Sequence, residues 1–191
     1  MMIRTTVLET PIGPLALLAL DADGQAPSHG QGPPNGQAPA PLGEPTLIAS
    51  GFTADPEELH ARLHPSLRSY GLEAVADLGA IGTAHEAYFG GDLDALADLA
   101  VHQPGSWRRE ALWKALRQVP AGHTVTYGEL AAQAGLERAA RAAGQACAQN
   151  LIAPAIPCHR VLPASGPQKS GGYYYGTDRK EWLLRHEAAR P

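Results

Sequence analysis

Residues 123–150 read HTVTYGELAAQAGLERAARAAGQACAQN, and this stretch does most to decide the fold. Thr126 is followed three residues later by Glu129, a spacing that makes a capping box and predicts a helix starting just after Thr126. Gly135 is expected to end that helix, and a second helix fits residues 137–148. Two short helices joined by a turn that contains glycine are typical of a helix-turn-helix.

The second of these helices carries few large side chains. Those that could reach outward are Arg138, Arg141, Gln145 and Gln149. A helix of this kind can approach a nucleic-acid backbone or a narrow groove closely, but it has little side-chain code with which to read bases. Tight packing of a small-residue helix inside a core would explain the same composition, and this helix alone does not separate the two interpretations.

A third helix is predicted immediately upstream. Ser106 suits an N-cap, apolar residues follow at helical spacing from Trp107 to Val119, and the residues at 120–122, Pro-Ala-Gly, close the pattern. We therefore expect an amphipathic helix that packs one face on a core.

The segment from Ile156 to Val161 reads IPCHRV and places a thiol, Cys158, beside an imidazole, His159. The thiolate is the nucleophile, so this neighbour suggests an activated cysteine. Adjacent side chains of an extended segment point to opposite faces, and a bridging water would then have to link the two groups. For a Cys-His pair taken alone, the alternative is a buried cysteine and a hydrogen-bonded core histidine.

A carboxylate near the C-terminus is a candidate partner for that histidine. Thr177 or Asp178 can cap a helix that runs on to Glu187, which shares an apolar face with two leucines. Such a carboxylate is either at a frayed helix end or buried and paired, because an isolated buried ion is costly. If Glu187 is buried, His159 is its natural partner. The order Glu187, His159, water, Cys158 then follows the logic of a catalytic triad with one solvent link.

The first half of the chain predicts a small sheet followed by helices. Residues 3–20 read as strand, tight turn and strand, and residues 46–52 fit a third strand of a meander. Helices are expected over residues 56–63 and 72–88. A domain boundary is expected near residues 100–105.

One segment of this half has an unusual composition. Residues 24–45 contain five Gly and six Pro and almost no large apolar side chain. Such a segment cannot bury enough surface to offset its ordering entropy. We therefore expect a mobile insertion between two strands.

Composition and charge narrow the class of protein. The chain has 191 residues, 44% of them apolar, and its two cysteines exclude a disulfide scaffold and a CxxC zinc pair. No run approaches the roughly 20 apolar residues of a membrane span, so a cytoplasmic protein is expected. Residues 1–100 hold three basic and 13 acidic side chains, whereas residues 101–191 hold 12 and six. This polarity suggests an anionic partner for the second half, although a chance imbalance between two solvated surfaces would look the same.

The IPCHRV segment resembles the Pro-Cys-His-Arg-Val active-site motif of the O6-alkylguanine-DNA alkyltransferases, nearest to their bacterial adaptive-response branch. Other segments agree with the family at the right separations: Val125-Thr126-Tyr127-Gly128, Arg141-Ala142-Ala143-Gly144, Asn150, and Lys180-Glu181-Trp182-Leu183-Leu184-Arg185-His186-Glu187. The resemblance covers roughly residues 105–188. It implies an α+β fold, with a small RNase H-like sheet-and-helix domain at 1–100 and a winged helix-turn-helix-like DNA-binding and catalytic domain at 101–191.

By similarity to that family, each motif residue acquires an expected role. Cys158 takes the alkyl group from O6 of a guanine rotated out of the duplex, while His159 and Glu187 lower the cost of its thiolate through water. Asn150 braces the turn before the active-site segment. Tyr127 crowds the target phosphate and donates its phenol hydrogen to the guanine ring.

The same resemblance assigns the base contacts. Arg141 fills the vacated place in the base stack. Arg160 and Val161 are grouped with the residues that bind DNA and the base, and the backbone carbonyls of Cys158 and Val161 accept from the exocyclic amine. The loop 163–175 departs from the family pattern, so the residues that close over the base are left unassigned.

The resemblance implies a single-turnover methylated-DNA–protein-cysteine methyltransferase, since a thioether at Cys158 offers no easy hydrolysis. It implies no cofactor and no metal. The implied partner is double-stranded DNA containing O6-alkylguanine, bound by a monomer, with O4-alkylthymine an open second substrate. The alternatives are a noncatalytic lesion-binding relative, a helix-turn-helix regulator with a structural cysteine, and a cysteine hydrolase using Cys158 and His159.

Overall fold

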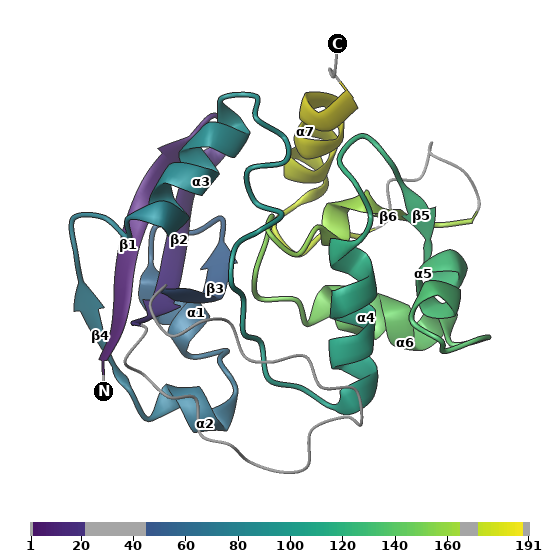
Figure 1. The fold of residues 1–191 in the computed structure, drawn as a ribbon, viewed down its shortest axis with the longest axis horizontal. Helices are drawn as coiled ribbons and strands as arrows, with labels where there is room; N and C mark the ends of the chain where they lie inside the picture. The colour runs from purple at the N-terminus through teal and green to yellow at the C-terminus, as the bar shows by residue number, and fades with distance from the viewer. Residues whose placement is uncertain (1, 22–44, 165–171, 189–191) are drawn as a thin grey trace.

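The structure is a computed structural model that describes residues 2–21, 45–164 and 172–188 (Figure 1). Apart from residue 45, the predicted insertion at 24–45 lies outside the described residues, as does most of the loop 163–175. Sheet and helices combine in one α+β fold, with the sheet on one side of the molecule and a group of helices on the other (Figure 1).

A four-stranded sheet forms the first half. Strands β1 (Met2–Thr10), β2 (Gly13–Leu20) and β3 (Thr46–Gly51) make the predicted antiparallel meander. Gly13 takes φ 104° in the tight turn between β1 and β2, a conformation that suits glycine. A fourth strand, β4 (Gly71–Ala74), runs parallel to β1, and the order is β3-β2-β1-β4.

Strand β2 is buried on both faces. Alternate residues of a strand point to opposite sides of the sheet. Leu15, Leu17 and Ala19 join the large core shared with the second half of the chain. Ala16, Leu18 and Leu20 instead join a smaller core under the short helices α1 (Pro56–His60) and α2 (Pro65–Arg68). The sheet is therefore the middle layer of the first half.

The predicted helices of the first half were only partly right. Helix α1 ends at His60 rather than at residue 63, and α2 was not predicted. The helix expected over 72–88 is wrong in its first part, because residues 71–74 form β4 and α3 spans only Ala80–Phe89. Pairing with β1 outweighs the weak helix propensity of this segment, and Gly79, at φ 57°, separates it from α3.

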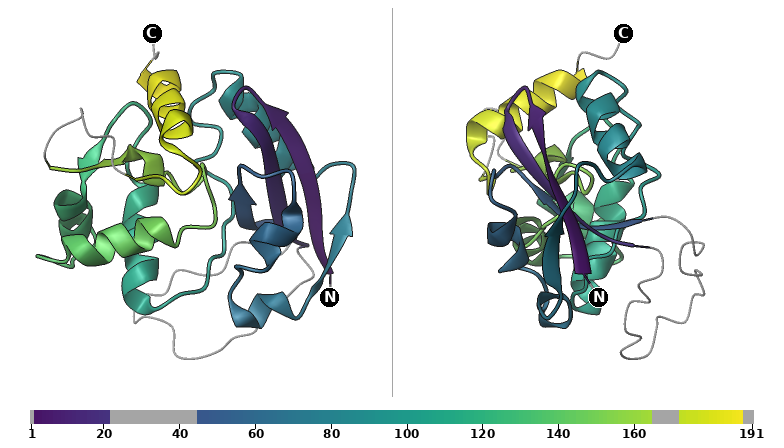
Figure 2. Two further views of the ribbon diagram at one scale, coloured as in Figure 1. Left: turned by 180° about the vertical axis from the view of Figure 1, so that it is seen from behind. Right: turned by 90° about the vertical axis from the view of Figure 1, so that its left-hand side faces the viewer.

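The second half is mainly helical. Its elements are α4 (Trp107–Arg117), β5 (Val125–Thr126), α5 (Tyr127–Gln133), α6 (Ala140–Ala148), the 3-10 turn η1 (Cys158–Arg160), β6 (Val161–Leu162) and α7 (Thr177–Ala188). The two short strands pair in parallel. In the views of Figure 2, α7 lies next to α3, so the last helix contacts the sheet half.

The predicted helix pair is present with one correction. The capping box is formed, because Thr126 Oγ1 accepts from the Glu129 amide at 3.2 Å while a Glu129 carboxylate oxygen accepts from the Thr126 amide at 2.7 Å. Helix α6 begins three residues later than the predicted 137, since Arg138 adopts φ 62°, which a right-handed helix does not allow. Helix α4 begins after Ser106 as predicted.

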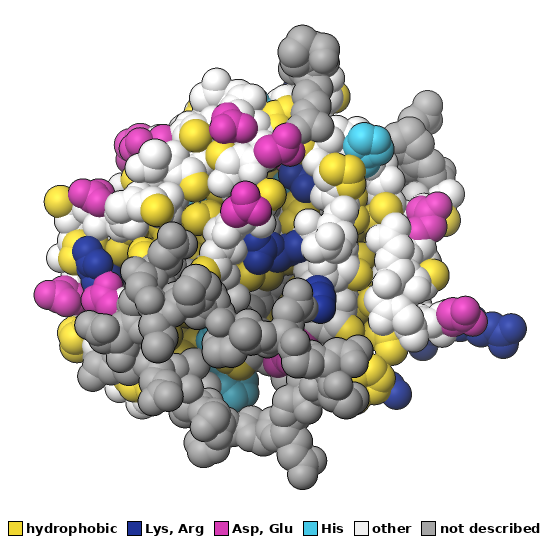
Figure 3. All heavy atoms as spheres, in the orientation of Figure 1, with side chains coloured by type: hydrophobic (Ala, Val, Ile, Leu, Met, Phe, Trp, Pro, Cys, Tyr) yellow, Lys and Arg dark blue, Asp and Glu magenta, His cyan; other side chains and the backbone are white. Residues whose placement is uncertain are grey.

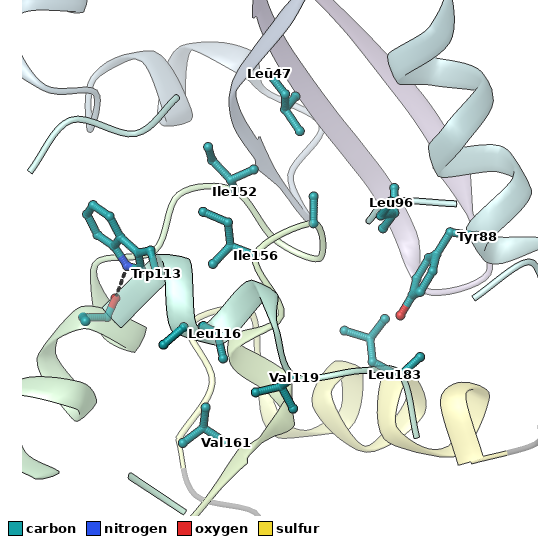
Figure 4. Packing of buried hydrophobic residues seen from close by; sticks show 14 of the residues in the cluster. Leu47, Tyr88, Leu96, Trp113, Leu116, Val119, Ile152, Ile156, Val161 and Leu183 are labelled. Carbon is teal, nitrogen blue, oxygen red and sulfur yellow. Dashed lines mark hydrogen bonds between the residues drawn. The ribbon is translucent and has the colours of Figure 1, made fainter. Parts of the chain in front are cut away.

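The two halves share one core (Figure 4). The indole of Trp113 in α4 donates to the Ala146 carbonyl of α6 at 2.9 Å. Ser50 of β3 exchanges backbone hydrogen bonds with the segment after α6: its amide donates to Leu151 and its carbonyl accepts from Ala153. The edge of the sheet therefore holds the segment that leads to Cys158.

Candidate active site

Asn150 organises the turn that presents Cys158. Its amide nitrogen Nδ2 lies 2.7 Å from the Ile156 carbonyl and 3.2 Å from Cys158 Sγ, and its Oδ1 accepts from the Ile152 amide at 3.0 Å. The side chain is buried, so these bonds satisfy groups that water does not reach. Asn150 therefore makes hydrogen bonds across the turn, where the resemblance led us to expect it, and its side chain also contacts the Cys158 sulfur.

Cys158 and His159 lie in a single 3-10 turn, where an extended segment was expected. Pro157 precedes the turn, and its carbonyl accepts from the amide of Arg160 at 3.0 Å. Cys158 is partly buried. Burial raises the pKa of its thiol, against the opposing effects of the Asn150 hydrogen bond and the positive charge of Lys180. The resting cysteine is therefore a protonated thiol at neutral pH.

His159 and Glu187 form the expected buried pair. Nε2 of His159 lies 2.8 Å from Oε1 of Glu187, and both side chains are almost fully buried. Burial lowers the pKa of His159 despite the nearby carboxylate. Burial alone would raise the pKa of Glu187, but the hydrogen bonds and charges of His159 and Arg160 hold it well below its usual range. The pair is therefore a neutral imidazole and a carboxylate.

This pairing fixes the tautomer of His159. A carboxylate can only accept, so Nε2 carries the proton and Nδ1 is left with a lone pair. Nδ1 is buried and has no hydrogen-bond partner within residues 2–21, 45–164 and 172–188. His159 thus has a free proton acceptor on the ring edge away from Glu187.

Arg160 belongs to the same buried network. Its Nε and Nη2 donate to the two oxygens of Glu187 at 2.9 and 2.8 Å, and its Nη1 donates to the Val119 carbonyl. The side chain is 10% exposed. Arg160 was grouped with the residues that bind DNA and the base, but the structure turns its guanidinium inward.

Sequence reasoning missed two further polar groups at the site. The hydroxyl of Tyr88, in α3, donates to Glu187 Oε1 at 2.8 Å. Lys180, in α7, is fully buried, and its Nζ donates to the Val161 carbonyl at 2.8 Å. The helical pattern around Lys180 gave no sign of burial, and nothing in the sequence connects Tyr88 with a residue 99 positions later.

The remaining predicted residues surround this centre. Tyr127 begins α5 and is half-buried; burial, together with the thiols of Cys147 and Cys158, raises its pKa. Arg141 is exposed on α6. Val161 is buried, and its carbonyl already accepts from Lys180.

Two tyrosines of the segment before α7, Tyr173 and Tyr175, pack against the shared core. The Tyr173 hydroxyl is buried without a hydrogen-bond partner among the described residues, and burial together with Cys158 raises its pKa well above the usual value. Tyr175 packs edge-on against Phe52 of the sheet half, with ring centroids 5.6 Å apart. Residues 165–171 of this loop lie outside the described part of the chain.

The charge polarity of the sequence is visible on the surface. On the face shown in Figure 3, Asp and Glu side chains gather mainly towards the upper left, over the sheet half and α3. In the described part of the chain, no helix is long and apolar enough to span a membrane, and no three His, Cys, Asp or Glu side chains are grouped as metal ligands would be.

Comparison with known proteins bears directly on this site. Residues 108–189 match the family model described as the DNA-binding domain of 6-O-methylguanine DNA methyltransferase. A methylated-DNA–protein-cysteine methyltransferase from Mycobacterium tuberculosis is 38% identical over 152 residues, which are 79% of this chain and 90% of that protein. This chain belongs to the methylated-DNA–protein-cysteine methyltransferase family.

Other members support the same relationship. The methyltransferase of Shigella flexneri is 38% identical over 125 residues, 65% of this chain and 72% of that protein. A solved structure of the Mycobacterium tuberculosis protein, described as a complex with DNA, has a TM-score of 0.67 and 30% identity, and the match covers 99% of this chain and 94% of that one. The fold of the family therefore extends through the first half as well.

Proposed function

We propose that this chain repairs DNA by moving an alkyl group from O6 of guanine to Sγ of Cys158. One observation carries the proposal: Cys158 adjoins a histidine whose Nε2 is bound to a buried carboxylate and whose Nδ1 is free to accept a proton. Membership of the methyltransferase family, with a relative described as a DNA complex, supports DNA as the partner.

The transfer follows from these groups. The thiol proton passes through a water to Nδ1 of His159, so the thiolate forms only as it is needed, because burial disfavours it at rest. The thiolate attacks the carbon bound to O6; the carbon–oxygen bond breaks as the carbon–sulfur bond forms. The released electron pair stays on the guanine, which takes a proton from the Tyr127 hydroxyl. The proton held by His159 then passes through solvent to Tyr127 and restores its hydroxyl.

The product explains why no cofactor or metal is required in this proposal. The alkyl group remains on Cys158 as a thioether, which offers no easy hydrolysis. Each chain therefore repairs one lesion.

The base has to leave the duplex to reach a partly buried sulfur. Tyr127 crowds the target phosphate, and Arg141, exposed on α6, takes the place of the base in the stack. The carbonyls of Cys158 and Val161 each accept one hydrogen bond within the protein and keep a second lone pair for the exocyclic amine. Arg160 holds Glu187 in this scheme.

The finer features of the fold fit the same function. Helices α5 and α6 act as a winged helix-turn-helix-like unit on double-stranded DNA, bound by a monomer, and residues 1–100 form an RNase H-like domain. The small side chains of α6 favour close approach to a groove over base reading. A cytoplasmic location stays a prediction from the sequence.

Mass spectrometry tests the proposal directly. After incubation with a duplex containing O6-methylguanine, the Cys158 peptide should carry one methyl group, and Cys158→Ser should take up none. Cys147→Ser is the matched control and should react fully. Unmodified Cys158 would favour a lesion-binding protein or a regulator, and repeated turnover without DNA would favour a hydrolase. A duplex with O4-alkylthymine tests the second substrate.

A further inference from the structure

Tyr88 connects the acidic half of the chain to the active site. It lies in α3, its side chain is 1% exposed, and its hydroxyl points towards α7 (Figure 4). That hydroxyl donates to Oε1 of Glu187 at 2.8 Å. Burial and the charge of Glu187 raise the pKa of Tyr88, so it remains a hydrogen-bond donor across the range in which proteins are stable.

The two oxygens of Glu187 are used unequally. Oε1 accepts from Tyr88, from Nε2 of His159 and from Nη2 of Arg160, whereas Oε2, among the residues that the structure describes, accepts only from Nε of Arg160. Arg160 alone would hold the carboxylate in a side-on pair but would not direct Oε1 at the imidazole. The Tyr88 hydroxyl approaches from the sheet half of the molecule and supplies that further constraint.

We propose that Tyr88 is a positioning residue for alkyl transfer: its hydroxyl holds Glu187 in the orientation in which Oε1 accepts the proton-bearing Nε2 of His159. This inference rests on the proposed function of Cys158. It assigns to the first half of the chain a part in the chemistry.

The Tyr88 hydroxyl affects alkyl transfer through the tautomer of His159. When Nε2–H is held by Glu187, Nδ1 can take the thiol proton. Without the Tyr88 hydroxyl, the Glu187 carboxylate turns more freely and the tautomer with the proton on Nε2 is populated less. A smaller fraction of molecules then has Nδ1 available to accept the proton of the Cys158 thiol. The charged and titratable groups bonded into this network are Glu187 and Lys180 on α7, Arg160 on η1 and Tyr88 on α3, whose ring also contacts His186. Tyr127 on α5, Cys147 on α6 and Tyr173 interact electrostatically with Cys158.

Tyr88→Phe tests the proposal, because it removes the hydroxyl and keeps the buried ring. The rate of methyl transfer by the full chain is measured as a function of pH. Each rate is divided by the total methyl uptake, so that only folded, reactive molecules are counted. We expect a fall of roughly tenfold at neutral pH, and a smaller deficit at high pH, where hydroxide replaces the base. Total uptake should still reach one methyl group per chain.

Tyr70→Phe is the matched control, since it removes a hydroxyl from the same half away from the site; its rate and pH profile should equal those of the wild type. A double variant adds Glu187→Gln. If Tyr88 acts through Glu187, Tyr88→Phe should slow that background far less than it slows the wild type. An unchanged rate and pH profile in Tyr88→Phe would overturn the proposal.

A second measurement does not depend on any variant folding. Nitrogen NMR of the His159 ring in the wild-type protein should show the proton on Nε2, and a proton on Nδ1 would refute the positioning role. The proposed function fails differently: in that case wild-type Cys158 takes up no methyl group, whatever happens in Tyr88→Phe.

Discussion

Nδ2 of Asn150 lies 3.2 Å from Sγ of Cys158, and the same nitrogen holds the Ile156 carbonyl at 2.7 Å. One amide therefore sets the backbone turn and also stabilises charge on the sulfur. A donor shared in this way couples the folding of the turn to the reactivity of the thiol.

Asn150→Ala should reduce both stability and reactivity. The substitution leaves the buried Ile152 amide without its partner, while the Ile156 carbonyl keeps its hydrogen bond from the Cys158 amide, so the loss should be about 1–3 kcal/mol of unfolding free energy. It also removes a hydrogen bond that lowers the pKa of Cys158, so the thiol should react more slowly at pH 8. Urea unfolding and the methyl-transfer rate measure the two effects. Gln149→Ala, at the exposed position just before Asn150, should change neither the stability nor the rate.

Lys180→Met should raise the pKa of the Cys158 thiol. The positive charge of Lys180 favours the thiolate, and methionine keeps the buried stem without the charge. We expect the pH profile of alkylation by iodoacetamide to move upward and the rate at pH 8 to fall several-fold. Arg185→Met, on the exposed side of α7, is the control; an equal shift there would show that long-range charge, and not Lys180, sets the pKa.

Gly51→Ala should displace the tyrosine segment near Cys158. A Cβ on Gly51 would overlap Tyr175 Oη and lie 2.6 Å from its Cζ, so the ring has to move. We expect a loss of roughly 1–3 kcal/mol in unfolding free energy, with partial recovery when Tyr175→Leu is added. Gly82→Ala, in α3 with nothing near the added carbon, should be neutral or stabilising. Wild-type stability in Gly51→Ala would contradict the close contact.

Arg141→Ala should slow base extrusion from the duplex without slowing the alkyl-transfer step itself. Arg141 is exposed and makes no hydrogen bond or ion pair within residues 2–21, 45–164 and 172–188, so the free energy of unfolding should change by less than about 0.5 kcal/mol. Repair of O6-methylguanine in duplex DNA should slow much more than reaction with the free base. Equal losses on both substrates would count against a role in base extrusion. Gln145→Ala, one turn later on α6, provides the comparison.

His85 should make the protein less stable in mild acid. It is fully buried, its Nδ1 donates to the Ile81 carbonyl, and burial lowers its pKa to about 4. The unfolded chain binds a proton near pH 6.5, before the folded state does, so stability should fall as pH drops from about 6.5 to about 4, by roughly 3 kcal/mol in all. Urea unfolding from pH 7 to 4 measures this slope. His85→Leu should flatten it, whereas replacing the exposed His64 should not.

Features set by neighbouring residues were predictable. The capping box at Thr126, the turn between β1 and β2, and the pattern of α4 depend on contacts a few positions apart, and each is present. The errors in the predicted secondary structure arose where pairing with a segment distant in the sequence decides the local conformation. Residues 71–74 pair with β1 and so form a strand, although their sequence also suits a helix.

The sequence by itself determined that the Cys158 thiol neighbours a histidine and that Glu187 lies on a helix, because these features follow from residue type and short-range spacing. Only the tertiary structure decided that Tyr88, Arg160 and Glu187 share one buried network and that Lys180 faces the Val161 carbonyl. The reason is physical: such bonds join residues brought together by the packing of α3 and η1 against α7, and no local pattern encodes which side chains then meet.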